Sequence, residues 1–140
     1  MAVAFVAVEA VTYNAASFTI TKPAGTAEND VMLMVCIQDR IVASPTLAGW
    51  TYELGPIDQG TNARGNVLRK VAGAGEPANY TFSCGDSPGA ACILTYSGNA
   101  VAAPINQKAG TVTADTSTPA SPSITPKVND CMIDSPRSRP

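Results

Sequence analysis

The chain has 140 residues, of which 45% are hydrophobic and only 14% are charged, and its net charge is −2. This length favours a single domain with a modest hydrophobic core. The charge balance argues against a nucleic-acid partner, which would require a basic patch, and no apolar run approaches the roughly 18 residues of a membrane-spanning helix.

Strand patterns dominate the first 40 residues. The opening MAVAFVAVEAV is expected to form a buried strand rather than a signal peptide, which needs a positively charged start. A second strand is expected over 17–21, SFTIT. The following stretch TKPAGTAEND is turn sequence, in which Gly25 permits a left-handed conformation. The apolar run VMLMVCI, at 31–37, predicts a strand that is buried on both faces.

The middle of the chain mixes irregular sequence with further strands. Residues 39–65 are rich in glycine and proline and are expected to be irregular. A strand is expected over 66–72, NVLRKVA. Two more, over 79–84 and 91–98, are expected to form a structural hairpin, and the residues between them form its exposed tip.

The number and spacing of these strands predict the fold class. With two weaker strand patterns, around Ile124 and from Cys131, the chain has seven to nine short strands separated by turn residues. This is typical of an all-β fold of the β-sandwich or jelly-roll type. Residues 1–106 are expected to form the main sandwich. Residues 107–133 are expected to be a polar loop with the last strand or strands of the same domain, and residues 134–140 a C-terminal tail.

The four cysteines, Cys36, Cys84, Cys92 and Cys131, allow three pairings. One interpretation is buried thiols that pack as small apolar side chains. The other is a Cys84–Cys92 bridge that closes the short loop GDSPGAA. The chain has no C-x-x-C pair and no histidine, so we expect no metal site.

No pattern for catalysis or for cofactor binding is present. Without histidine there is no Ser-His-Asp triad, and there is no S-x-x-K pair or glycine-rich phosphate-binding loop. We therefore expect a protein that is not an enzyme and needs no cofactor. Trp50 and Tyr52 are the candidate binding residues, because aromatic faces can stack on sugar rings. In the competing interpretation, Trp50 is a core residue.

Several segments carry a family resemblance. In this order, ITKPAGTAENDVMLMVCI, AGWT, NVLRKVAGAGEPANYTFSC and ILTYSGNAVAAPI resemble a domain common in tailed-phage structural proteins and prophage-like genes. The likeness extends over roughly residues 18–106. The matching positions are Lys22 to Thr26 with Asp30, Gly49 to Thr51, Lys70 with Ala72, Glu76-Pro77, Tyr80 to Phe82, Tyr96 with Gly98, and Pro104-Ile105.

The resemblance implies a β-sandwich that serves in a virion, as part of a tail fibre or tail tip or as a capsid decoration, and it implies no catalytic residue. The expected location is the virion, and the expected partners are other virion proteins and further copies of the chain, without nucleic acid or membrane. The alternative function is a carbohydrate-binding module of a tail fibre, which would bind host-surface glycans through Trp50 and Tyr52.

Two positions depart from the family pattern. Asn29 replaces the usual glycine, which is tolerable because asparagine accepts a left-handed conformation. The family continues with a long apolar strand where this chain has CMIDSPRSRP, so that either this strand is shortened or a neighbouring subunit completes the sheet.

Overall fold

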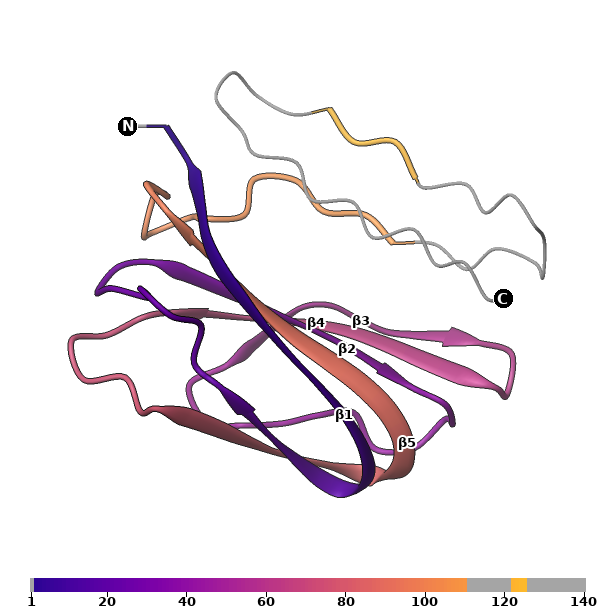
Figure 1. Cartoon of the computed structure of the whole chain (residues 1–140). Coiled ribbons are helices and arrows are strands. Elements are labelled where there is room, and N and C mark those ends of the chain that lie inside the picture. Colours follow the sequence, from indigo (N-terminus) through magenta and orange to yellow (C-terminus); the bar gives the residue numbers. More distant parts are fainter. Residues whose placement is uncertain (1, 111–121, 126–140) are drawn as a thin grey trace.

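The computed structural model of the chain describes residues 2–110 and 122–125. These residues contain β-strands and no helix, which confirms the all-β fold class. The strands are β1 (Ala4–Thr21), β2 (Val31–Gln38), β3 (Thr51–Gln59), β4 (Ala63–Val71) and β5 (Asn79–Ser97). They form one antiparallel sheet in the order β1-β5-β2-β4-β3 (Figure 1).

The described part of the chain has five strands rather than seven to nine, because two strands are much longer than expected. The two runs expected within the first 21 residues are one strand of 18 residues, β1. The two halves of the expected hairpin are likewise one strand of 19 residues, β5. Residues 122–125, around Ile124, form no strand, and the pattern from Cys131 lies outside the described residues.

The predicted hairpin with an exposed tip is wrong. Most of the expected tip continues β5 and pairs with β1, and Ser87 in its middle is fully buried. The glycines there allow close packing instead of a turn. A Cβ atom at Gly89 would lie 2.5 Å from the ring of Tyr13 and 2.7 Å from the backbone oxygen of Ile37. A sequence typical of a turn thus occupies a place where three strands approach closely.

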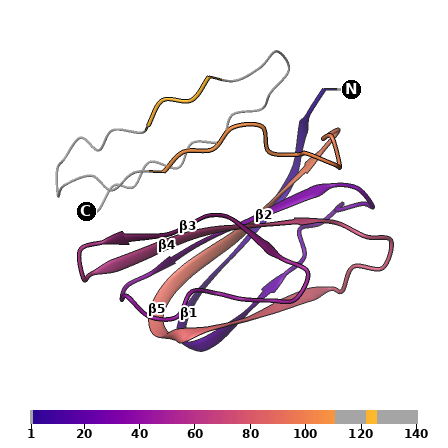
Figure 2. The ribbon, with the colours of Figure 1, turned by 180° about the vertical axis from the view of Figure 1, so that it is seen from behind.

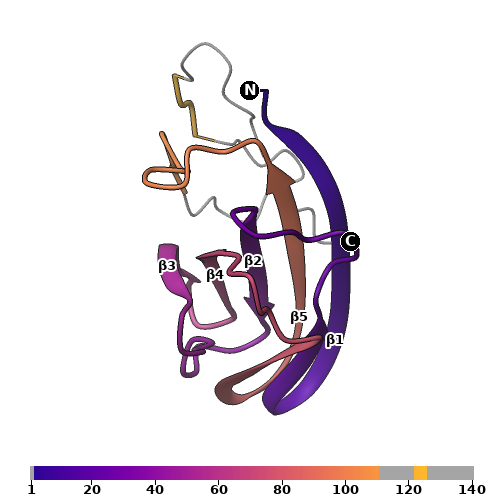
Figure 3. The ribbon, with the colours of Figure 1, turned by 90° about the vertical axis from the view of Figure 1, so that its left-hand side faces the viewer.

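β1 and β5 bend together, at a register shift between Ala15 and Ser17, so that the sheet folds over its own core. Figure 3 shows both strands curving round one end of the molecule. Beyond the bend, residues 17–21 of β1 pair with residues 79–83 of β5, and these two segments are called the returning half. Figure 2 shows the returning half across from β2 and β4. The two parts meet in one hydrophobic cluster. It contains Phe18, Ile20, Tyr80 and Phe82 from the returning half, Met32, Met34 and Leu68 from β2 and β4, and Ile93 from the other half of β5.

Residues 39–65, expected to be irregular, contain β3 and the start of β4. β3 pairs with β4 although it carries Gly55 and Pro56. Proline is tolerated there because β3 lies at the edge of the sheet, where one side of the backbone needs no partner. Register shifts on both sides of Leu54 accommodate these residues.

The turn before β2 has the conformation expected from its sequence. Gly25 and Asn29 have φ angles of 77° and 69°, which confirms that both adopt the left-handed conformation. The Asp30 carboxylate accepts a hydrogen bond from the backbone N–H of Ala27 at 2.8 Å. The turn therefore delivers the chain into β2 without leaving this buried carboxylate unpaired.

A smaller hydrophobic cluster lies on the opposite face of the sheet, where the chain after β5 crosses it. Val31, Leu33 and Tyr96 are buried there, and Ile105 packs against them. Lys108 adds an ion pair to Glu53 of β3, at 2.7 Å. Residues 99–110 therefore pack on the sheet. Most of the expected loop at 107–133, and the whole expected tail at 134–140, lie outside the described residues.

Candidate functional site

The structure brings the two candidate aromatic residues, Trp50 and Tyr52, to the wall of one open depression of about 450 Å³. Its lining residues are Thr46, Leu47, Ala48, Trp50, Tyr52, Leu68, Thr81 and Ser83. The walls carry hydroxyl and phenol groups beside apolar surface, and none of the lining side chains carries a charge at neutral pH. The depression is therefore suited to binding an uncharged polar ligand.

Trp50 is a core residue. Its side chain is 9% exposed, and its ring meets Tyr80 and Phe82 edge-on, with ring centres 5.3 and 5.2 Å away. The packing interpretation of Trp50 is thus the one that the structure supports. Its indole N–H is buried and has no hydrogen-bond partner among the described residues.

Tyr52 is the more accessible of the two, with 39% of its surface exposed. Its hydroxyl group donates a hydrogen bond to the backbone oxygen of Pro45. Partial burial raises the pKa of Tyr52, and this effect outweighs the opposing effect of a hydrogen bond with Ser44. Tyr52 is therefore a neutral phenol at physiological pH.

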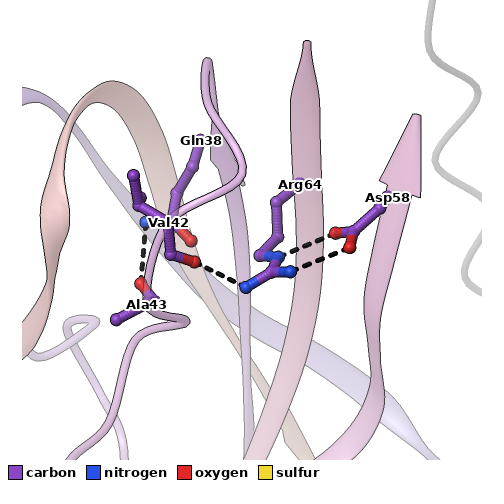
Figure 4. Close-up of polar contacts among 5 residues, drawn as sticks. All are labelled: Gln38, Val42, Ala43, Asp58 and Arg64. Atoms are coloured by element: carbon purple, nitrogen blue, oxygen red, sulfur yellow. Dashed lines mark hydrogen bonds and ion pairs between the residues drawn. The ribbon is translucent and has the colours of Figure 1, made fainter. Parts of the chain in front are cut away.

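The loop between β2 and β3, which forms one wall of the depression, is anchored by two polar side chains. Arg64 donates two hydrogen bonds to the Asp58 carboxylate, at 2.7 and 2.8 Å, and a third to the backbone oxygen of Val42 (Figure 4). The hydrogen bonds from Arg64 hold the pKa of Asp58 below its usual value. Gln38 donates from Nε2 to the backbone oxygen of Ala43 at 3.0 Å.

The same loop also pairs with the returning half of β5. Thr46 and Ser83 exchange two backbone hydrogen bonds, of 2.8 and 3.1 Å. The backbone N–H of Gly85 donates to the oxygen of Ala43 at 2.8 Å. These bonds place a short extended segment beside β5, and they complete the wall that faces Trp50.

A second polar cluster lies next to the core, around Glu76. Its carboxylate accepts hydrogen bonds from the backbone N–H of Gly73 at 2.8 Å and from the Tyr80 hydroxyl at 2.7 Å, and Lys70 lies 2.9 Å away. Burial alone would raise the pKa of Glu76, but these three partners together lower it. This carboxylate is therefore held ionised as part of the framework.

The described residues contain no group of three or more histidine, cysteine, aspartate or glutamate side chains that could hold a metal ion. Glu53 of β3 is paired with Arg69 of β4 and with Lys108 of the chain after β5, and none of these three residues lines the depression. None of the described segments is a helix long and apolar enough to span a membrane.

Cys84 and Cys92 are thiols on the same strand. Cys92 lies opposite Ala10 of β1, whereas the Cys84 sulfur is 3.7 Å from the backbone oxygen of Ala15. Five residues of β1 separate these two positions, and an extended strand rises about 3.3 Å per residue. The two cysteines are therefore much farther apart than the Cα distance of about 4.4–6.8 Å that a disulfide spans. The loop that the alternative Cys84–Cys92 bridge would close is therefore absent, and burial raises the pKa of both thiols.

β1 carries an exposed apolar surface that was not predicted from the sequence. Phe5 and Val8 are 55% and 49% exposed, although the opening segment was expected to form a buried strand. Their cross-strand partners are Tyr96 and Leu94, on the face of the sheet away from the main core. The sequence does not show which face is exposed, because apolar side chains lie on both faces of β1, Phe5 and Val8 on one and Val11 and Tyr13 on the other.

Comparison with protein-family models, with curated proteins and with solved structures finds no match to this chain. The description of the chain therefore rests on its own fold and site. It is a small all-β domain with an uncharged depression at one end of β3 and exposed apolar side chains on β1, at the edge of the sheet.

Proposed function

We propose that this chain is a non-enzymatic structural protein of a tailed-phage virion, which decorates or stabilises the capsid or forms part of the tail. Its partners are other virion proteins and further copies of the chain, and it uses no cofactor, nucleic acid or membrane. The sequence resemblance over roughly residues 18–106 supports this proposal, as does the small proportion of charged residues.

The observation that carries the proposal is that residues of the phage-like pattern contact one another. Glu76 binds both Lys70 and Tyr80, and Tyr80 packs against Trp50. All four belong to the motifs that carry the resemblance, although they are up to 30 residues apart in the chain. A pattern whose members hold the core together supports a shared scaffold, and the resemblance to that scaffold implies no catalytic residue.

We further propose that the domain is of the β-sandwich or jelly-roll type. The support is the bend in β1 and β5, which places their returning half across the core from β2 and β4. The segment that pairs at Thr46 and Ser83 adds to the layer that this half forms.

The test of the virion proposal is to look for the chain in purified particles. Phage particles from the source culture are banded in a density gradient, searched for peptides of this chain by mass spectrometry, and labelled with immunogold. We expect the chain to band with the particles and the gold to lie on the capsid or the tail. Recovery of the chain only from the soluble fraction would contradict the proposal.

A carbohydrate-binding module is the second candidate, because Trp50 and Tyr52 line the same uncharged depression. We expect a host-surface glycan that binds there to shift the fluorescence of Trp50, the only tryptophan in the chain. Tyr52→Ala should weaken binding about tenfold or more, because it removes the exposed ring. Thr61→Ala, in the turn between β3 and β4, is the control that should bind normally. Because Trp50 is mostly buried, binding is also measured by calorimetry, and a panel of glycans that gives no Tyr52-dependent binding excludes this function.

A further inference from the structure

We propose that the outer edge of β1 pairs antiparallel with the same edge of a second copy of this chain, so that the two sheets join across a two-fold axis. The inference deepens the proposed structural role, on which it rests, by naming the surface and the partner of self-association. It is carried by the position, composition and exposure of β1.

β1 is the edge strand of the sheet and pairs only with β5 among the described residues. Its other side therefore presents a row of backbone donors and acceptors that an extended chain can satisfy. Natural edge strands are protected by lysine, proline or covering segments. From Ala4 to Thr21, β1 has no lysine, arginine or proline, and Glu9 is its only charged residue.

The opposite edge of the sheet, β3, has two protective features that β1 lacks among the described residues, a proline and a covering segment. β3 carries Pro56, which makes it a poor template for another strand, whereas β1 has register shifts of its own but no proline. Lys108 of the chain that follows β5 forms an ion pair with Glu53 of β3, and Gly110 packs against Ile57. As far as the described residues show, the contrast between the two edges indicates that the edge of β1 is available for pairing.

The side chains of β1 favour a second copy as the partner. Phe5 and Val8 are exposed on one face, and Ala10 is exposed beside them. A two-fold axis perpendicular to the sheet would bring these small and apolar side chains of both copies together on the same face. Glu9 lies on the other face, opposite Ile93, so that no charge interrupts this apolar strip.

The position of Glu9 also excludes one register of the pair. Pairing centred on Glu9 would place two carboxylates directly opposite each other, which is destabilising. Pairing centred on Ala10 sets Val8 opposite Thr12 of the second copy and Glu9 opposite Val11. We therefore expect a register centred on Ala10 or on Val8.

The experiment measures the mass of the full chain by light scattering from about 1 to about 100 µM, because a dimer responds to concentration. We expect the wild type to approach the mass of a dimer. Val8→Lys with Ala10→Lys places four like charges at the interface and should weaken the dimer about 100-fold or more. Thr61→Lys with Asn62→Lys, in the exposed turn between β3 and β4, adds the same charge and should leave the dimer intact.

Hydrogen exchange locates the contact in the wild type and needs no variant to fold. Amides in residues 4–13 should exchange more slowly at high than at low concentration, whereas amides in β4 should not change. A monomer at every concentration would overturn the inference, as would an oligomer that the β1 lysines leave intact or that gives no protection in β1. None of these results affects the banding of the chain with particles, so the virion proposal is tested separately.

Discussion

Replacing Phe82 by alanine is expected to lower the free energy of unfolding by about 3–5 kcal/mol. Phe82 has no exposed surface, stacks on Phe18 with ring centres 5.2 Å apart, and meets Trp50 at the same distance. The substitution opens a cavity between the two parts of the bent sheet. Because domains of this size are stable by only about 5–15 kcal/mol, the loss is a large part of the total.

Urea unfolding followed by the fluorescence of Trp50 measures this change. The matched control is Phe5→Ala, the same chemical change at a ring that is 55% exposed. It should cost less than about 1 kcal/mol at a protein concentration at which the chain is monomeric. Equal losses for the two variants would mean that the returning half of β5 does not pack over the core.

Replacing Glu76 by glutamine is expected to cost about 2 kcal/mol at pH 7, because it removes the charge to which Lys70 and Tyr80 bind. The cost should depend on pH. The pKa of Glu76 in the folded chain is lowered from its ordinary value of 4.5, so the carboxylate stabilises the fold fully above that pH. This contribution is lost as the pH falls through the lowered pKa. The stability difference between wild type and variant should therefore shrink below about pH 4.5.

Thermal unfolding of both proteins between pH 3 and pH 8 provides the measurement. Glu28→Gln, at an exposed position in the turn before β2, is the control and should differ little from wild type at any pH. A pH-independent difference for Glu76→Gln would show that the loss comes from altered packing rather than from the charge.

Local patterns in the sequence predicted the features of this fold that depend on local chemistry. The apolar run at 31–37 forms β2 at the centre of the sheet, and Asn29 takes the left-handed conformation expected of it. The pattern around Gly89 was misread as a turn, because the close approach of Tyr13 and Ile37 decides its conformation. These contacts come from distant parts of the chain, and no local pattern reports them.

The candidate site was predicted only in part. The sequence named Trp50 and Tyr52 but could not show that Thr46, Thr81 and Ser83 complete the same depression. That arrangement depends on the bend of β5 and on the anchoring of the preceding loop by Arg64. The exposure of Phe5 and Val8 was also unpredictable, because it depends on which strand ends up at the edge of the sheet.

The pairing of Ala4 with Ser97 has a consequence for synthesis of the chain. β1 leaves the ribosome before the other described strands, but its only strand partner among the described residues is β5, which is made after β2, β3 and β4. At about 5–20 residues per second, the first strand waits roughly 5–20 seconds before β5 is made. During that time an apolar segment with a single charge is exposed in every nascent chain. Where ribosomes are crowded on one messenger, neighbouring nascent chains can therefore meet through β1 before either has folded.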